Sequence, residues 1–227
     1  NCKKKQPDAK RYTPFERNAD RYDHWFDEPK GRSLFPVELR CISTMLDGLK
    51  RPWLEVGVGT GRFAEALGID YGCDPSRKVL DYATVRGIKT TEARAENLPY
   101  KDASFAAVFL IVTVCFLQDP GVAFGECRRV LAPEGALIIG LVPKSSTWGR
   151  AYAAEGRRGH PFYSVATFYT LGKVISLAAE QGFNLTASQS TLFQPPGQDV
   201  EPLSRPQAGL RPDAGFTAMR FSRKEER

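Results

Sequence analysis

Three glycines at alternate positions follow an apolar run that contains an acid, and they are the part of the sequence best suited to binding a ligand. The stretch reads WLEVGVGTGRFAEALG, from Trp53 to Gly68. The residues of interest in it are Glu55, Gly57, Gly59 and Gly61. Alternate glycines let the backbone turn tightly and approach a ligand without a Cβ clash. Between a strand and a helix of a parallel sheet, such a loop predicts a bound nucleotide-type cofactor at the carboxyl end of the strand.

The spacing of these glycines argues against a nicotinamide dinucleotide. That fingerprint requires GxGxxG after the strand. Here the third glycine, Gly61, comes one residue early, and Arg62 occupies the place of the third glycine in that pattern. An NAD(P)-dependent oxidoreductase therefore stays only as an alternative.

A second candidate for cofactor binding is an acid at the end of the next predicted strand. The segment YGCDPSRKVLDYA begins at Tyr71, and its Asp74 lies 17 residues after Gly57. A carboxylate in this place can accept hydrogen bonds from both hydroxyl groups of a ribose. The other interpretation is that Asp74, just before Pro75, is a favourable negative charge at a helix N-terminus.

Two further motifs follow in order, and together the four carry a resemblance to a known family. They are ARAENLPYKDASFAAVFL (93–110) and VLAPEGALIIGLVPKSSTWGR (130–150). Over roughly residues 15–193 the chain resembles a class I S-adenosylmethionine-dependent methyltransferase, of the small-molecule group that includes the ubiquinone-biosynthesis type. The resemblance implies S-adenosyl-L-methionine as cofactor and methyl transfer to a small-molecule acceptor.

The resemblance also implies roles for individual residues. The glycine loop would pack under the methionine and ribose portions of the cofactor, with Glu55 orienting the loop and the methionine amino end. Asp74 and Pro75 would border the ribose, and Ala95 and Glu96 would border the adenine edge. Two positions depart from many relatives, which carry Asp where Arg94 and Ala106 stand here. The change at Arg94 leaves the contact with the adenine amino group open, and a non-catalytic, cofactor-binding interaction protein stays an alternative.

The alternation of apolar runs and helical spacing predicts the fold. The expected strands are 52–56, 69–73, 88–92, 105–114, 136–141, 183–193 and 214–222, with a turn at 132–135. Strands alternating with helices predict a Rossmann-like, doubly wound α/β fold. We expect a seven-stranded, mostly parallel sheet with an antiparallel C-terminal strand and helices on both faces.

The same pattern of strands and helices predicts how the chain is organised. We expect a disordered basic tail at 1–14 and a single methyltransferase domain at 15–227. Within that domain the predicted parts are a helical cover at 15–50, a cofactor-binding core at 51–142, an irregular lid insertion at 143–166, and a C-terminal helix and strands at 167–223.

Composition limits the partners and the metal chemistry. The net charge of +6 comes from the ends, because residues 1–21 hold seven Lys or Arg against three acids and residues 220–227 hold four against two. A neutral body argues against nucleic-acid binding. The longest apolar run, 105–117, is too short to cross a bilayer. Two histidines and five cysteines without a CxxC pair predict no metal site. With no secretory signal visible, we expect a cytoplasmic protein; oligomeric state is left open.

The residues that would act on the acceptor are less clearly marked. His160 and Tyr163, in RRGHPFYS, are the candidate acid/base pair, and His160 as an ordinary surface residue is the alternative. Tyr22, in RNADRYDHWF, is the candidate aromatic face for the sulfonium, against ordinary core packing. Thr113 and Cys115 are expected to line a pocket. Attack by nitrogen, oxygen, sulfur or carbon fits the sequence equally well.

Overall fold

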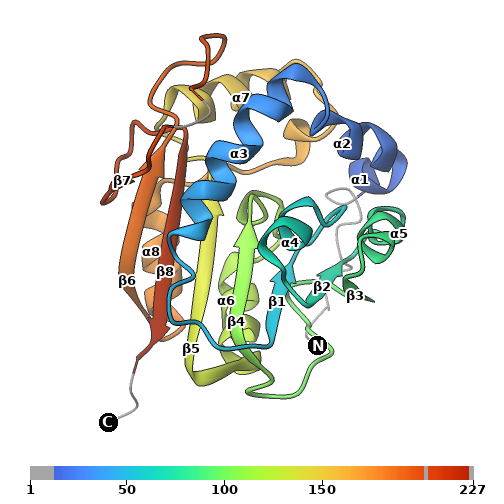
Figure 1. Cartoon of the computed structure of the whole chain (residues 1–227), viewed down its shortest axis with the longest axis vertical. Coiled ribbons are helices and arrows are strands. Elements are labelled where there is room, and N and C mark those ends of the chain that lie inside the picture. Colours follow the sequence, from blue (N-terminus) through green and yellow to red (C-terminus); the bar gives the residue numbers. More distant parts are fainter. Residues whose placement is uncertain (1–12, 202–203, 225–227) are drawn as a thin grey trace, which may run out of the picture.

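The computed structural model describes residues 13–201 and 204–224, and its centre is one twisted sheet (Figure 1). The strand order is β3-β2-β1-β4-β5-β8-β6-β7. The strands are β1 (Trp53–Val56), β2 (Tyr71–Asp74), β3 (Lys89–Glu92), β4 (Phe105–Ile111), β5 (Leu131–Leu141), β6 (Phe183–Thr191), β7 (Gln207–Ala208) and β8 (Phe216–Arg223). The first five are parallel, and β8 is antiparallel to both β5 and β6. The predicted fold class is therefore confirmed.

The number of strands differs from the prediction. The sheet has eight strands rather than seven, because two residues of the Pro- and Gly-rich connection between β6 and β8 pair with the edge of β6. β5 also begins at Leu131, five residues earlier than expected. Leu131 pairs with Phe105, and the next pair joins Ala107 to Ala136, so the predicted turn at 132–135 is an irregularity within the strand.

Helices cover both faces of the sheet. On one face lie α3 (Pro29–Ser43), α4 (Arg62–Leu67) and α5 (Arg77–Val85), packed over Trp53, Phe109 and Ile138. On the other lie α6 (Pro120–Val130) and α8 (Leu171–Glu180), packed over Leu54, Val108 and Leu137. Alternate residues of each central strand thus enter different cores, which explains why these strands read as continuous apolar runs.

The remaining helices gather over the carboxyl ends of the parallel strands, at the top of Figure 1. They are α1 (Thr13–Arg17), α2 (Ala19–Trp25) and α7 (Thr147–Arg157), with two 3₁₀ turns, η1 (Val114–Phe116) and η2 (Tyr163–Val165). Thr13 and Pro14, assigned to the disordered tail from the sequence, belong to α1; the rest of that tail lies outside the described residues.

The predicted lid at 143–166 is not irregular, since half of it is helix α7. Ser146 caps this helix, its Oγ accepting from the Gly149 N–H at 2.9 Å. Gly149 and Gly156 obscured the helical pattern, but both are packing glycines. A Cβ would come within 2.2 Å of the Pro143 carbonyl oxygen at Gly149, and within 2.5 Å of the Tyr163 carbonyl oxygen at Gly156.

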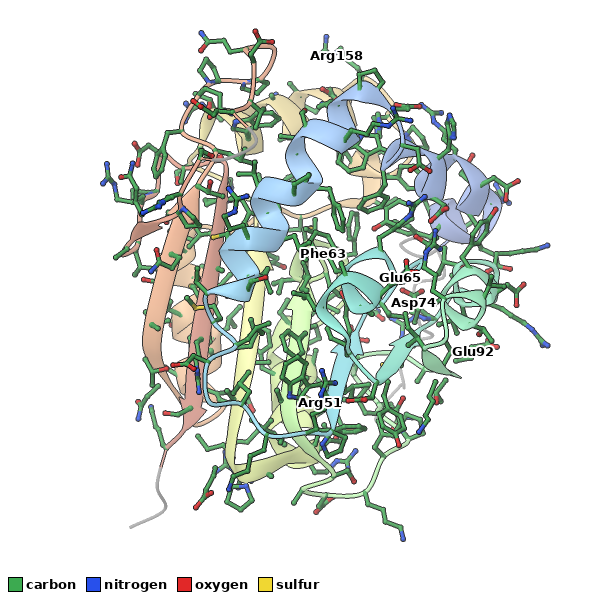
Figure 2. The ribbon with its side chains drawn as sticks, viewed as in Figure 1. Arg51, Phe63, Glu65, Asp74, Glu92 and Arg158 are labelled. Carbon is green, nitrogen blue, oxygen red and sulfur yellow. The ribbon has the colours of Figure 1, made fainter. Side chains whose placement is uncertain are left out.

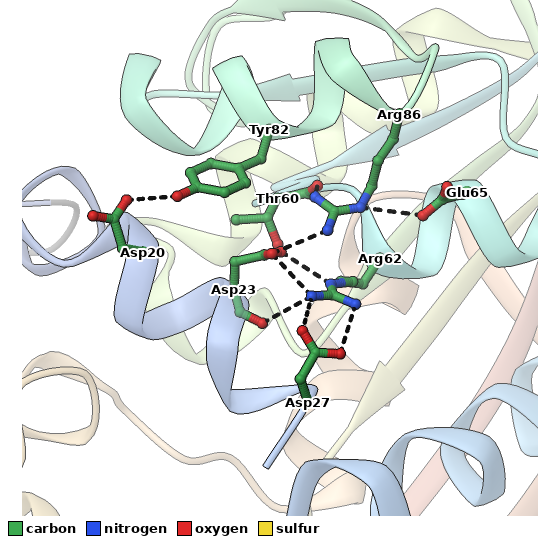
Figure 3. Close-up of polar contacts among 8 residues, drawn as sticks. All are labelled: Asp20, Asp23, Asp27, Thr60, Arg62, Glu65, Tyr82 and Arg86. Carbon is green, nitrogen blue, oxygen red and sulfur yellow. Dashed lines mark hydrogen bonds and ion pairs between the residues drawn. The ribbon is translucent and has the colours of Figure 1, made fainter.

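Ionic contacts fasten the N-terminal helices to the core (Figure 3). Asp23 of α2 accepts from Arg62 Nε and Nη2 at 3.0 and 2.9 Å, and from Arg86 Nη2 at 3.0 Å. Asp27 accepts from the same Arg62 guanidinium at 2.7 Å. Arg62, which stands where a dinucleotide fingerprint would have glycine, is thus the anchor for α2. Although burial alone would raise the pKa of Asp23, the guanidinium hydrogen bonds hold it below its usual value.

A second set of contacts joins α1 and α2 to α5. Glu16 Oε2 accepts from the Ser76 hydroxyl at 2.7 Å, and Asp20 Oδ1 accepts from the Tyr82 hydroxyl at 2.5 Å. The helical cover is therefore held by side-chain contacts to the elements beside the glycine loop.

Helix α3 carries one acid on its buried face. Leu34, Val37, Cys41 and Ile42 are at most 1% exposed, and Glu38, which falls on the same stripe, is 8% exposed. Glu38 forms no hydrogen bond or ion pair with any other described residue, and burial raises its pKa to about 8. The buried, otherwise apolar face of α3 therefore contains a carboxyl group.

Replacing Asp23 should loosen the N-terminal cover. In Asp23→Ala two largely buried guanidinium groups lose their common carboxylate, and we expect a loss of about 2–4 kcal/mol in the free energy of unfolding. Asp27→Ala is the matched control, because the Asp27 side chain is 48% exposed and solvent screens its contact. Urea unfolding of both variants would measure the difference. Equal effects of the two changes would mean that the pairing at Asp23 does not hold the cover.

Glu38 should give the protein a stability that falls as pH rises. Its folded-state pKa lies above its usual value of 4.5, so between that value and about 8 the folded state retains a proton that the unfolded chain loses. We expect Glu38→Gln to flatten the decline by up to about 1.4 kcal/mol per pH unit. Urea unfolding of both proteins across this range would measure the slopes, and parallel slopes would contradict the assignment.

Candidate active site

Two adjoining cavities open at the carboxyl ends of the parallel strands. The glycine-loop cavity has a volume of about 80 Å³ and is lined by residues of the loop, of β2 and of the 94–96 segment. The aromatic cavity has a volume of about 290 Å³ and lies under α2, α3 and α7. They share the residues Phe15, Tyr22, Ile111, Val112 and Phe116. A molecule in one cavity would thus meet a molecule in the other at this shared wall.

The glycine loop has the conformation that its sequence predicts. Gly57 and Gly59 have φ values of +74° and +53°, a region that suits glycine, and both line the first cavity. The N–H groups of Gly57 and Val58 donate to the Cys73 carbonyl oxygen at 2.7 and 3.0 Å. A Cβ on Gly57 would come within 2.3 Å of Thr113 Cγ2, so the close packing of two strand ends requires glycine here.

Gly61 lies outside the lining of the cavity. It is the N-cap residue of α4, with a φ of +84°, and a Cβ there would come within 2.5 Å of Ile88 Cδ1. The structure thus gives Gly61 a packing role. A contact between Gly61 and a cofactor stays a prediction.

Asp74 lies at the end of β2 and lines the glycine-loop cavity beside Pro75 (Figure 2). Its Oδ2 accepts from the Gly59 N–H at 3.1 Å, and its Oδ1 accepts from the Ser76 N–H at 2.9 Å. Burial raises its pKa to about 6. The bond to Ser76 supports the helix-terminus interpretation. Because an ionised carboxylate has about four acceptor positions, two remain for a ligand.

Glu55 is buried behind the loop and does not line the cavity. It is 2% exposed, and its Oε2 has no hydrogen-bond partner among the described residues. Burial and the nearby charge of Asp74 raise its pKa well above the usual value. This oxygen is an unused acceptor beneath the glycine loop.

The segment predicted to border an adenine lines the far wall of the same cavity. Ala95 and Glu96 are both part of the lining, as is Arg94. Glu96 Oε1 accepts from the Gln118 and Asp119 N–H groups at 2.8 and 3.2 Å. Glu96 therefore shapes the turn between η1 and α6 in addition to facing the cavity.

The shared wall contains a strained residue. Val112, just after β4, has a φ of +53°, which is rare for a β-branched residue. Its N–H donates to the Gly140 carbonyl oxygen at 2.8 Å, which holds the strand end in this shape. The predicted strand at 105–114 accordingly ends at Ile111. Thr113 and Cys115, predicted to line a pocket, face the glycine-loop and aromatic cavities respectively.

Tyr22 lies at the junction of the two cavities, since it lines both. A contact between its ring and a sulfonium stays a prediction. A Cβ on Gly59 would come within 3.1 Å of its ring. The ring also makes edge contacts with Phe15, Phe26 and Phe162, at centroid distances of 5.2, 5.8 and 5.5 Å. Tyr22 is thus both a packing residue and a wall of both cavities.

The predicted acid/base pair lies in the aromatic cavity. The His160 ring stacks on Tyr163 at 4.2 Å, and Tyr163 stacks on Tyr152 at 4.5 Å. The Tyr163 N–H donates to His160 Nδ1 at 3.4 Å, so the neutral imidazole carries its proton on Nε2. Burial lowers the pKa of His160 and raises that of Tyr163. Near neutral pH the imidazole is a base and the phenol a hydrogen-bond donor; a catalytic role for either stays a prediction.

Sequence reasoning did not find the acid of the aromatic cavity. Glu38 lines it, together with Glu28 and Arg21. The available signal was its position four residues after Leu34, on the periodic buried stripe of α3. Among the described residues there is no group of three or more His, Cys, Asp or Glu that could hold a metal. The described helices also include none long and apolar enough to span a membrane.

Comparison with known proteins agrees with this arrangement. A methyltransferase-domain family model matches residues 54–139. An uncharacterized protein of Mycobacterium tuberculosis is 40% identical over 203 residues, which are 89% of this chain and 71% of that protein. A demethylmenaquinone methyltransferase of Thermotoga maritima is 27% identical over 175 residues, covering 65% of this chain and 76% of its own length.

A solved structure from Thermotoga maritima is similar over almost the whole chain. It is described as an S-adenosylmethionine-dependent methyltransferase, possibly a histamine N-methyltransferase. It is 33% identical, with a TM-score of 0.85, and the match covers 94% of this chain and all of that one. The glycine loop, the acid at the end of β2 and the sheet order agree with this match. The chain belongs to the S-adenosylmethionine-dependent methyltransferase family.

Proposed function

We propose that this protein binds S-adenosyl-L-methionine in the glycine-loop cavity and transfers its methyl group to a small molecule in the aromatic cavity. The observation that carries the proposal is the shared wall. One cavity is lined by seven of the nine residues that the sequence predicts for the cofactor, and it meets the other at Tyr22, Ile111 and Val112. Methyl transfer requires two such sites in line.

The residues of the first cavity fit the cofactor. Asp74 has two acceptor positions left for the hydroxyl groups of a ribose. Glycine at positions 57 and 59 lets the loop pack closely against Thr113 and Tyr22, two other walls of the cavity, because a Cβ would come within 2.3 Å of the first and 3.1 Å of the second. Glu55 lies behind the loop and outside the lining of the cavity, so a contact between its unused Oε2 and the methionine amino group stays a prediction. Ala95 and Glu96 would border the adenine.

When bound, the cofactor supplies an electrophilic methyl group on a sulfonium. The work of the protein is to align the acceptor with that group and to exclude water. The shared wall is suited to both tasks, since aromatic faces attract a cation and exclude water. Its aromatic residues are Phe15, Tyr22 and Phe116.

The two alternative functions, an oxidoreductase and a non-catalytic binding protein, have less support. No finding favours an NAD(P)-dependent oxidoreductase. A non-catalytic relative would keep the first cavity and would not transfer a methyl group, so the two are separated by assaying methyl release. The neutral body of the chain supports a small-molecule acceptor over a nucleic acid. A cytoplasmic location stays a prediction.

Loss of the Asp74 carboxylate should weaken cofactor binding. We expect S-adenosylhomocysteine to raise the melting temperature of the protein, as a ligand of the folded state must. Asp74→Ala should lower its affinity by about 1–3 kcal/mol, roughly five- to 150-fold, while Asp74→Asn, which keeps one acceptor oxygen, should lose less. Calorimetric titration measures the three affinities.

Glu92→Ala is the matched control for this experiment. Glu92 pairs in register with Asp74 at the end of the neighbouring strand, is exposed, and lies outside the lining of the cavity (Figure 2). We expect its affinity to match that of the unaltered protein. If Asp74→Ala also bound normally, the ribose assignment would be wrong; if the unaltered protein bound no cofactor product at all, the proposed function itself would fail.

A further inference from the structure

The aromatic cavity combines many rings with a single buried acid. Its ring-bearing walls are Phe15, Tyr22, Trp25, Phe26, Phe63, Phe116, Tyr152, His160, Phe162, Tyr163 and Phe168. Of the carboxyl groups that line it, Glu28 is exposed and Glu38 is buried. A cationic acceptor and an anionic acceptor would therefore interact with these walls in opposite ways, one attracted and the other not.

Glu38 lacks a partner within the part of the chain that the structure describes. It is 8% exposed, and none of the hydrogen bonds or ion pairs of the described residues involves it. Glu38 contributes to the raised pKa values of Cys41, Tyr152 and Tyr163, and all three of these groups are neutral near pH 7. A buried carboxyl without a counter-charge is costly to the fold, so its presence in a cavity wall points to a ligand that pairs with it.

The cations around the cavity do not reach this acid. Arg21 lines the cavity but is exposed, and the exposed Lys30 lies with its Nζ 5.0 Å from the centre of the Tyr152 ring. Neither forms an ion pair with Glu38. The pKa of His160 is lowered by burial and by these two cations, so the imidazole is neutral at pH 7. The interior of the cavity is therefore aromatic and acidic.

Aromatic walls around a carboxylate are suited to an organic cation. Ring faces attract a cation, most strongly where water is excluded, and a carboxylate supplies the counter-charge. An anionic acceptor would meet no cation of the described residues inside the cavity, and it would be repelled by Glu38 wherever that carboxyl group has lost its proton. A neutral alcohol would need a far stronger base than this cavity contains, because neither Glu38 nor His160 can remove a proton held so tightly.

Resting on the proposed function, we propose that the aromatic cavity is the acceptor site for an amine, and that Glu38 binds its ammonium group and takes the proton from it. Glu38 would then be a catalytic residue in the strict sense, since its carboxylate contacts the reacting nitrogen.

The step balances without a further reactant. The ammonium N–H bond breaks, and its proton goes to a Glu38 carboxylate oxygen, which leaves the nitrogen lone pair free. That lone pair forms the bond to the methyl carbon as the carbon–sulfur bond breaks, its electron pair passing to sulfur. The product is the N-methylammonium, and Glu38 returns its proton to water. With a pKa of about 8 in the empty cavity, Glu38 holds a proton at pH 7, and binding of the ammonium ion would first release that proton to water. The buried carboxylate so formed suits the task better than an exposed one, because burial raises its affinity for a proton toward that of an amine.

The test compares the binding of ligands that have similar shapes and different charges. The probes are 2-phenylethylamine, 2-phenylethanol and phenylacetate, followed by a panel of small and aromatic amines, each paired with its matched alcohol. Binding is measured by calorimetry on protein saturated with S-adenosylhomocysteine, and methyl transfer by mass spectrometry with S-adenosylmethionine. The proteins are the unaltered chain, Glu38→Gln and Glu28→Gln, the last being a change of the exposed carboxyl on the same cavity.

We expect amines to bind at least about tenfold more tightly than their alcohols, with phenylacetate weakest. Glu38→Gln should lower amine affinity about tenfold or more, leave alcohol affinity unchanged and abolish N-methylation, whereas Glu28→Gln should stay within about threefold of the unaltered protein.

Two results would overturn this inference. One is a panel in which no amine binds better than its matched alcohol; the other is amine binding and methylation by Glu38→Gln at the unaltered level. Normal binding of S-adenosylhomocysteine by all three proteins shows that Glu38→Gln is folded. It also separates these results from a failure of the proposed function, in which the cofactor product itself would not bind.

Discussion

The carboxylate of Asp74 joins the parts from which the site is assembled. Through its two oxygens it holds the Gly59 N–H of the glycine loop and the Ser76 N–H at the start of α5. The loop, the end of β2 and a helix N-terminus are thereby fixed around one group. The same carboxylate faces the first cavity with its remaining acceptor positions. The structural and the ligand-binding interpretations of Asp74 are thus compatible, because an ionised carboxylate accepts several hydrogen bonds at once.

The cavities exist because the N-terminal helices are held over the strand ends. Most of the polar contacts responsible are ionic, with Asp23 between Arg62 and Arg86 as the most buried. Arg62 is adjacent to the last glycine of the loop, so the cover is attached directly to the element that it covers. Phe15 and Tyr22 come from this cover and line both cavities. A change in the ionic contacts should therefore be felt at the junction where the methyl group would pass.

The site also concentrates features that cost stability. Among the residues that the structure describes, Glu38 is a buried acid without a partner and Glu55 has a buried oxygen without one; Val112 has a left-handed backbone. Such features are expected at functional sites, where local consistency is given up for chemistry. All three lie in or next to the walls of the two cavities, while the cores on both faces of the sheet are apolar and closely packed.

The sequence by itself determined the sheet class, the glycine loop, Asp74 and the positions of seven of the eight strands. These depend on short-range rules: strand period, glycine backbone freedom and helix caps such as Thr170, whose hydroxyl accepts from the Lys173 N–H. Helix α7 was missed because Gly149 and Gly156 weaken its local pattern. Glycine is needed at both positions because the chain on either side of the helix, at Pro143 and Tyr163, folds back against them. The junction at Tyr22 and the burial of Glu38 were decided by the tertiary structure alone. Both depend on where α2 and α3 dock on the strand ends, and that docking comes from contacts between residues dozens of positions apart.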